Sequence, residues 1–223
     1  MPVSIVENID CMVGMARYPD KYFDLAIVDP PYGIGNTTTS AGNKHRKTLH
    51  KRVKWNEQIP SKEYFNELFR ISRNQIIWGC NYFYPYISVP GRIVHYKRPF
   101  QDLSKNKILF CPCDLASQSF NNRIEYFEYN WYGNTQGGKP NFNNSGPDAR
   151  IHPTQKPIIL YKWLLKKYTK EGDKIIDTHM GSQSSRIACY DGGFDYWGWE
   201  IDKDYFNDGN KRFENYKAQL KLF

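Results

Sequence analysis

The sequence predicts an α/β fold in which helices cover both faces of a mostly parallel, twisted sheet. Short apolar runs typical of strands alternate along the chain with longer amphipathic segments typical of helices. This alternation indicates a parallel sheet whose connections cross over its faces. The length of 223 residues suits a single domain, residues 1–223, that buries a full core.

Six strands are expected from runs rich in aliphatic and aromatic residues. They lie at 24–28, 75–78, 92–96, 123–129, 174–177 and 196–200. Four helices are expected at 61–71, 157–168, 182–191 and 205–219. Ser61 is a suitable cap for the first helix, and Pro157 suits the first turn of the second.

Two long polar stretches interrupt the alternation. Residues 33–56 are basic, and residues 130–150 are rich in Gly, Asn, Ser and Pro. Loops of this length inside a compact domain are usually functional or disordered. Because open α/β sheets bind ligands beyond the carboxyl ends of their strands, residues 33–56 are expected to rim a pocket after the strand at 24–28.

The composition favours an anionic partner. The net charge is +8 and the pI is about 9.1, which indicates a partner such as nucleic acid. Six cationic side chains fall within an acid-free run, and these candidate DNA contacts are Lys44, Arg46, Lys47, Lys51, Arg52 and Lys54.

The five Cys lack metal-ligand spacing, so reduced thiols and no metal site are expected. No apolar run reaches the length of a membrane span, and no signal peptide is evident, so a soluble, intracellular protein is expected.

The tetrapeptide Asp29-Pro30-Pro31-Tyr32 follows the apolar run 25–28 directly. Each Pro fixes its φ and donates no backbone hydrogen, so the segment offers hydrogen-bond acceptors. The Tyr32 ring can stack on a planar base, which stabilises a complex by about 1–3 kcal/mol. A Pro-rich turn is the structural alternative, but the acid before and the ring after favour a site for a base with an exocyclic amine.

A second candidate site follows the strand at 174–177. Asp177 ends that strand, and a turn of small residues containing Gly181 and Ser182 opens a helix, which lets a ligand approach the backbone closely. Glu200 ends the next strand and suits the two hydroxyls of a ribose. An ordinary strand-to-helix turn is the alternative for the first feature taken alone.

The segment His152-Pro153-Thr154-Gln155-Lys156-Pro157 precedes the second expected helix. A Pro-initiated helix entry is its structural interpretation. Thr154 and Lys156 can also donate hydrogen bonds to a carboxylate or contact a hydroxyl group, which favours a ligand site.

Taken in order, these motifs resemble those of amino-group DNA methyltransferases of the permuted type, whose catalytic tetrapeptide precedes the cofactor strand. The resemblance spans most of the chain and implies a Rossmann-like methyltransferase fold without a separate large recognition domain. It implies S-adenosylmethionine as cofactor and Asp29, Pro30, Pro31 and Tyr32 as catalytic residues. The implied cofactor contacts are Asp10, Cys11, Thr154, Lys156, Asp177, Gly181, Ser182 and Glu200.

The resemblance also implies the reaction and the setting. An Asp before Pro-Pro favours the N6 amine of adenine in double-stranded DNA over the N4 amine of cytosine. Methylation of an RNA base or a protein amide, and a non-catalytic nucleic-acid-binding protein on the same scaffold, are the remaining alternatives. We expect a cytoplasmic enzyme of a bacterial or phage-infected cell, associated with the nucleoid. The enzyme could form a homodimer. It could also belong to a system with a cognate restriction endonuclease that it does not contact directly.

Two features depart from the family pattern. Gln183 occupies a position where the cofactor turn commonly has Gly, and it fits there if its φ stays negative and its side chain turns away from the ligand. The recognition region is short, so DNA contacts are expected from residues 33–56 and 130–150, the latter including Arg150, or from a second subunit.

Overall fold

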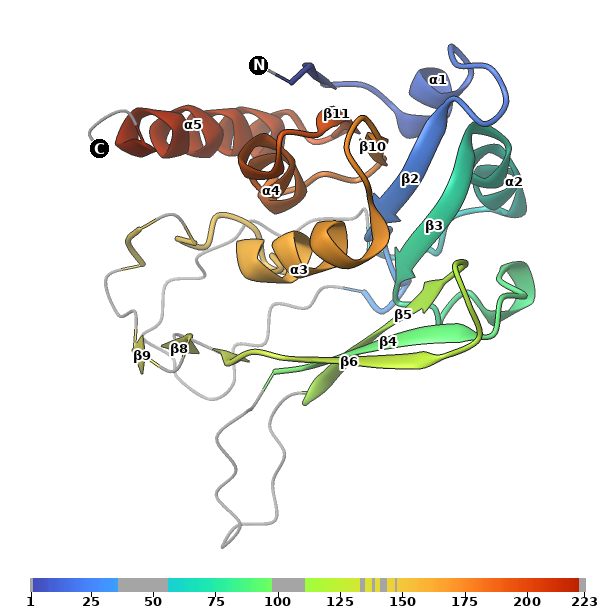
Figure 1. Cartoon of the computed structure of the whole chain (residues 1–223), viewed down its shortest axis with the longest axis horizontal. Helices are drawn as coiled ribbons and strands as arrows, with labels where there is room; N and C mark the ends of the chain where they lie inside the picture. The colour runs from blue at the N-terminus through green and yellow to red at the C-terminus, as the bar shows by residue number, and fades with distance from the viewer. Residues whose placement is uncertain are drawn as a thin grey trace, which may run out of the picture.

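The computed structural model describes residues 2–35, 56–97, 111–132, 135–137, 139–140, 144–146 and 148–220. These residues build an eight-stranded sheet with the order β1-β11-β10-β2-β3-β5-β4-β6 (Figure 1). Its strands are β1 (Ser4–Glu7), β2 (Phe23–Val28), β3 (Ser72–Trp78), β4 (Gly91–Tyr96), β5 (Cys113–Gln118), β6 (Ile124–Glu128), β10 (Lys174–Asp177) and β11 (Asp195–Trp199). Of the strands in this sheet, β5 runs antiparallel to both of its neighbours, and every other pairing is parallel.

Helices pack on both faces of the sheet, as predicted. They are α1 (Cys11–Met15), α2 (Lys62–Ile71), the 3-10 turn η1 (Tyr84–Tyr86), α3 (Ile158–Tyr168), α4 (Ser184–Gly192) and α5 (Lys203–Leu220). One core cluster joins the sheet to α3, α4 and α5, and the other joins it to α1 and α2. In Figure 1, α3 and α4 lie on the side of the sheet opposite to α2.

The strand β2 has an apolar run because both of its faces are buried. Leu25 and Ile27 pack in the cluster under α3 and α4, whereas Ala26 and Val28 pack in the cluster under α2. All four side chains are at most 1% exposed. Alternate residues of a strand point to opposite faces, so a strand covered on both faces needs apolar residues at every position.

The six predicted strands are present with ends shifted by at most a few residues, but β1 and β5 were missed. The strand β5 reads Cys-Asp-Leu-Ala-Ser-Gln, which carries no apolar run. Ser117 and Gln118 are nevertheless fully buried, and Gln118 donates to the Asn121 backbone oxygen at 2.9 Å and accepts from the Phe120 amide at 2.8 Å. These bonds with the following turn compensate for burying a polar side chain, and local sequence reasoning does not anticipate them.

The described residues of the segment 130–150 include three short strands. Its strands β7 (Trp131–Tyr132), β8 (Thr135–Gln136) and β9 (Lys139–Pro140) form a small antiparallel sheet. Strands of only two residues give too weak a pattern to predict from the sequence. In the part of the chain that the structure describes, no helix is long and apolar enough to cross a membrane.

Candidate active site

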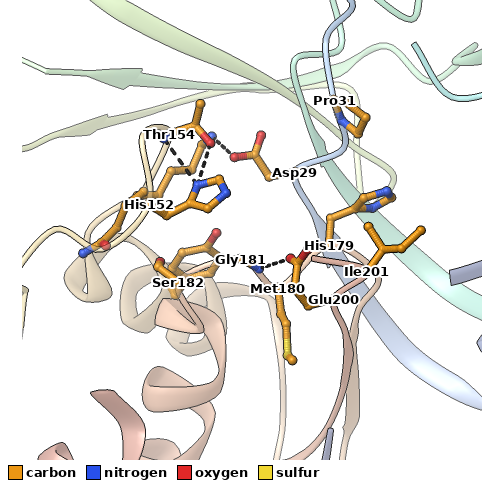
Figure 2. Close-up of a pocket in the computed structure, with 13 residues that line it drawn as sticks. Asp29, Pro31, His152, Thr154, His179, Met180, Gly181, Ser182, Glu200 and Ile201 are labelled. Carbon is orange, nitrogen blue, oxygen red and sulfur yellow. Dashed lines mark hydrogen bonds and ion pairs between the residues drawn. The ribbon is translucent and has the colours of Figure 1, made fainter. Parts of the chain in front are cut away.

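One cavity joins the two candidate sites of the sequence. The strands β2, β10 and β11 are parallel neighbours, so their carboxyl ends bring Asp29, the turn after β10 and Glu200 to the same edge of the sheet. A cavity of about 130 Å³ opens between them (Figure 2). It is lined by Asp29, Pro31, His152, Thr154, Gln155, Lys156, Tyr161, His179, Met180, Gly181, Ser182, Glu200 and Ile201.

The Asp29 carboxylate has a partner on each oxygen. The Lys156 ammonium donates to Oδ2 at 2.5 Å, and the Tyr32 hydroxyl donates to Oδ1. The Lys156 Nζ atom also lies 3.3 Å from the Tyr32 hydroxyl. The Lys156 side chain is 5% exposed and that of Asp29 is 15% exposed, so this ion pair is largely shielded from water. Removing one partner of such a pair leaves an uncompensated charge, which costs about 3–5 kcal/mol in fully buried cases.

Tyr32 occupies a tightly defined position beside Asp29. Its ring stacks on Tyr82 with a centroid distance of 5.0 Å and an interplanar angle of 15°. It also covers Gly79, where an added Cβ would lie 2.2 Å from the ring and where φ is +74°. Burial and the Asp29 charge raise the pKa of Tyr32 well above its ordinary value, so its hydroxyl stays a hydrogen-bond donor.

Asn56 fixes the backbone that carries this tetrapeptide. Its side-chain oxygen accepts from the Tyr32 amide at 2.9 Å, and its side-chain nitrogen donates to the Gly35 carbonyl at 2.8 Å. Asn56 is 4% exposed. It closes the long segment that begins at residue 33, and nothing in its local sequence marks it for this role.

Glu200 organises the opposite wall of the cavity. Its Oε2 accepts from the Gly181 amide at 3.0 Å, and its Oε1 accepts from the Asp202 amide at 2.9 Å. Burial raises the pKa of Glu200. Gly181 has a φ of +44°, so the turn here uses the conformational freedom of glycine.

Asp177 lies behind this wall and is not among the lining residues. It accepts from the Ser185 hydroxyl at 2.6 Å and from the His179 amide at 3.1 Å, so it holds the turn to the first residues of α4. Burial raises the pKa of Asp177 to about 7, and the charges of Asp29 and Glu200 act in the same direction.

Asp10 and Cys11 are likewise not among the residues that line the cavity. The Asp10 side chain caps α1 by accepting from the Met12 amide at 2.7 Å. The Cys11 sulfur lies 4.0 Å from Nε2 of His179, which lines the cavity. Burial raises the pKa of Cys11 to about 12 and lowers that of His179 to about 4, so both are neutral near pH 7.

The sequence also matches a known protein family. A family model described as DNA methylase matches residues 94–211, which is more than half of the chain. The chain belongs to the DNA methylase family. This membership confirms the resemblance seen in the sequence and, with it, S-adenosylmethionine as the expected cofactor.

Several relatives of this methylase cover nearly all of its chain. The type II methyltransferase M.HpaI of Haemophilus parainfluenzae is 21% identical over 91% of this chain and 71% of its own. The crystal structure of the M1.HpyAVI–SAM complex superposes with a TM-score of 0.60 at 16% identity, covering 94% of this chain and 100% of that one. The cytosine-N4-specific PvuII DNA methyltransferase also reaches 0.60, at 11% identity, covering 97% of this chain and 93% of that one. The Rossmann-like methyltransferase fold is thereby confirmed.

The chemistry of the cavity in this methylase fits a cationic cofactor. Two carboxylates, Asp29 and Glu200, line the same small space, and Asp177 lies just behind it. Burial is the main cause of the raised pKa of Asp177, and the negative charges of Asp29 and Glu200 raise it further. A sulfonium and an ammonium group both gain from such a field. Glu200, Gly181 and Ser182 line the cavity, and their polar groups can meet hydroxyl and carboxylate groups of a ligand.

The backbone of Gln183 differs from the expectation. Its φ is +60°, in the left-handed region, and not negative. The side chain does turn away from the cavity: it donates to Asn210 Oδ1 at 3.1 Å, accepts from Arg186 at 2.8 Å and covers Gly209 of α5. The left-handed conformation costs an L-residue about 1–2 kcal/mol, which these buried contacts offset.

Several residues that line the cavity were not predicted from the sequence. His152 and Gln155 belong to the motif that contains Thr154 and Lys156, and His152 Nδ1 lies 3.1 Å from the Thr154 hydroxyl. Their place in the motif was the available signal. Tyr161 lines the cavity from α3, where its position within an apolar helix offered no signal.

The predicted DNA contacts fall in two groups. The six cations between Lys44 and Lys54 lie outside the described residues. Arg150 lies apart from the cavity of Asp29 and lines a different one, on α5.

Proposed function

We propose that this DNA methylase transfers a methyl group from S-adenosylmethionine to the exocyclic N6 amine of adenine in double-stranded DNA. One observation carries the proposal: the carboxylate of Asp29 and the wall formed by Gly181, Ser182 and Glu200 line the same cavity. A base held at Asp29 therefore faces a cofactor held at Glu200. S-adenosylmethionine supplies an electrophilic methyl group on a sulfonium.

Asp29 and the carbonyl of Pro30 accept the two hydrogens of the amine. The amine lone pair of a free base is delocalised into the ring, which makes the nitrogen a poor nucleophile. Two acceptors draw the nitrogen towards a tetrahedral geometry and turn its lone pair towards the methyl group. Each Asp29 oxygen has a second lone pair, so the amine can bind while Lys156 and Tyr32 keep their hydrogen bonds.

Lys156 and Tyr32 position the reacting groups. Lys156 fixes the orientation of the Asp29 carboxylate through the ion pair at Oδ2. The Tyr32 ring, supported from behind by Tyr82, stacks on the base after it leaves the duplex, and this stacking offsets a few kcal/mol of lost base stacking. Correct positioning of reactants supplies much of the acceleration in reactions of this kind.

The cofactor contacts follow from the lining of the cavity. Glu200 receives the ribose hydroxyls, and the turn at Gly181 and Ser182 contacts the cofactor through its backbone. Thr154 contributes from the opposite side. Asp10, Cys11 and Asp177 act indirectly, by holding α1 and the turn in place.

The N4 amine of cytosine is the second candidate. The likeness of the fold to the cytosine-N4-specific PvuII enzyme supports it, whereas Asp29 in place of a Ser before Pro-Pro supports adenine. Purified protein should be incubated with unmodified DNA and S-adenosylmethionine, and the digested nucleosides should be resolved by mass spectrometry. N6-methyladenine is expected, N4-methylcytosine would identify the second candidate, and no methylated nucleoside would contradict both.

The DNA substrate needs contacts beyond the cavity. We propose that the six cations between Lys44 and Lys54 neutralise phosphates, so that binding weakens as salt is raised. A homodimer and a cognate endonuclease that acts without direct contact remain parts of this proposal, and the type II relative supports such a setting.

A further inference from the structure

A second cavity, of about 500 Å³, lies between α5 and the segment that precedes α3. Three cationic side chains and one carboxylate line it: Arg150, Lys211, Arg212 and Asp208. Asn215 and Gln219 add amide groups to the α5 wall. The lining therefore has a net positive charge and several hydrogen-bond donors.

Arg150 has donors with no acceptor. Its guanidinium carbon lies 4.4 Å above the Trp131 ring, and its Nε and Nη2 atoms are buried without a hydrogen-bond partner. Burial lowers the pKa of Arg150, which indicates that its charge is poorly solvated. A buried donor on a charged group without an acceptor is costly, because both hydration and the hydrogen bond are lost. A bound anion would remove this cost.

The position of Arg150 is fixed by the surrounding chain. Its amide donates to Asn144 Oδ1 at 2.6 Å, and its carbonyl accepts from Asn144 Nδ2 at 2.9 Å. The Trp131 ring below it is held by a bond from Nε1 to the Gln155 carbonyl at 2.7 Å. The guanidinium is therefore preorganised, which reduces the entropy lost when it binds a ligand.

The other two cations have different roles. Arg212 is 8% exposed, pairs with Asp148 at 3.2 Å and donates to the Ser182 carbonyl at 2.6 Å, so it forms a neutralised wall that reaches the cofactor turn. Lys211 is exposed, as is Asp208 one turn earlier. Arg150 and Lys211 are thus the cations that remain for a ligand, and Asp208 offsets part of their charge.

We propose that this cavity binds a phosphate group of the DNA backbone, held by the Arg150 guanidinium and the Lys211 ammonium. The Nε and Nη2 atoms of this planar guanidinium, which have no partner among the described residues, match two phosphate oxygens once an anion reaches them. The inference rests on the DNA substrate of the proposed function. It adds a contact on a face built by α5 and separate from the cavity that holds Asp29.

The salt dependence of DNA binding tests this assignment. The affinity for a labelled duplex should be measured by anisotropy between about 50 and 200 mM salt, because each phosphate contact adds about 0.9 to the slope of log K against log salt. Arg150→Gln and Lys211→Gln should each reduce the slope by about that amount, and the double variant by about twice as much. Lys166→Gln removes an exposed cation from α3 and should leave the slope unchanged.

The possible results distinguish a phosphate of the DNA backbone from free inorganic phosphate as the ligand of this cavity. The proposal is wrong if all three variants, the two single ones and the double one, show the same slope of log K against log salt as the unsubstituted protein. If inorganic phosphate raises the melting temperature of the unsubstituted protein but not of Arg150→Gln, while the DNA slopes stay equal, the cavity binds free phosphate and the DNA assignment is wrong. Lys211→Gln changes an exposed residue and keeps the test valid if Arg150→Gln fails to fold.

The test is also independent of methyl transfer. Binding is measured without cofactor, so an altered slope would support the phosphate site even if no methylated nucleoside were formed. Conversely, normal methylation with unchanged slopes would contradict the phosphate site alone.

Discussion

The Lys156 ammonium lies 2.5 Å from Oδ2 of Asp29, although the two residues are 127 positions apart in the chain. One belongs to the tetrapeptide after β2, and the other to the segment that leads into α3. The family resemblance implies that Lys156 contacts the cofactor, but its ion pair joins it to Asp29, the residue proposed to bind the target amine. The two assignments make different predictions.

Lys156→Met should reduce the rate of methyl transfer by about 10–100-fold, because the Asp29 carboxylate loses its orientation. The dissociation constant for S-adenosylmethionine, measured by calorimetry, should change little. Lys156→Arg should restore part of the rate, since it keeps the charge. A variant with a normal rate but much weaker cofactor binding would instead support the cofactor assignment.

Asp29→Ala should abolish methyl transfer while leaving cofactor affinity close to normal, because Glu200 is the carboxylate that we propose binds the cofactor. Transfer is followed with radiolabelled cofactor, and binding by calorimetry. In Asp29→Ala the Lys156 charge lacks its partner, so a comparison with the Asp29→Ala/Lys156→Met double variant controls for destabilisation. Residual methylation near the normal rate would show that Asp29 is not required.

Glu200→Ala should raise the dissociation constant for S-adenosylmethionine by about 10–100-fold, which corresponds to the roughly 1.5–3 kcal/mol of a hydrogen bond to a charged group. The Glu200→Ala substitution also removes the acceptor to which the amides of Gly181 and Asp202 donate. Glu200→Gln keeps one acceptor and serves as the matched control, with an intermediate effect. An unchanged dissociation constant in both variants would remove Glu200 from the cofactor site.

Gln183 and Gly209 should be energetically coupled. A Cβ on Gly209 would lie 2.6 Å from Nε2 of Gln183, so Gly209→Ala should lower the free energy of unfolding by about 1–3 kcal/mol. In a Gln183→Gly background this overpacking disappears, and the same substitution should cost much less. Urea unfolding of the four proteins measures the coupling, and additive effects would mean that the two residues do not share this contact.

Asp177 should make the protein less stable as pH rises. Its folded-state pKa of about 7 lies above its ordinary value, so the folded state holds a proton that the unfolded state releases. The free energy of unfolding should therefore decrease between about pH 4 and 7, relative to Asp177→Asn, by roughly 2–4 kcal/mol. Urea unfolding of both proteins across this range tests the difference. His179 titrates in both proteins, so its contribution cancels in the comparison. If the difference in free energy of unfolding between the two proteins does not change with pH, the pKa of Asp177 is not raised.

The sequence by itself determined the fold class and the edge of the sheet that carries the site. Continuous apolar runs such as 25–28 indicate strands buried on both faces, and the carboxyl ends of parallel strands meet at one edge. Because Asp29 and Glu200 directly follow such strands, their presence at a common site could be predicted from local pattern alone.

Only the tertiary structure decided which groups touch. The pairing of Lys156 with Asp29 and the bond from the Tyr32 amide to Asn56 join residues distant in the chain. The left-handed φ of Gln183 likewise depends on α5, whose Gly209 leaves room for its side chain. Local propensity cannot report such choices, because their energies come from partners that the fold brings together.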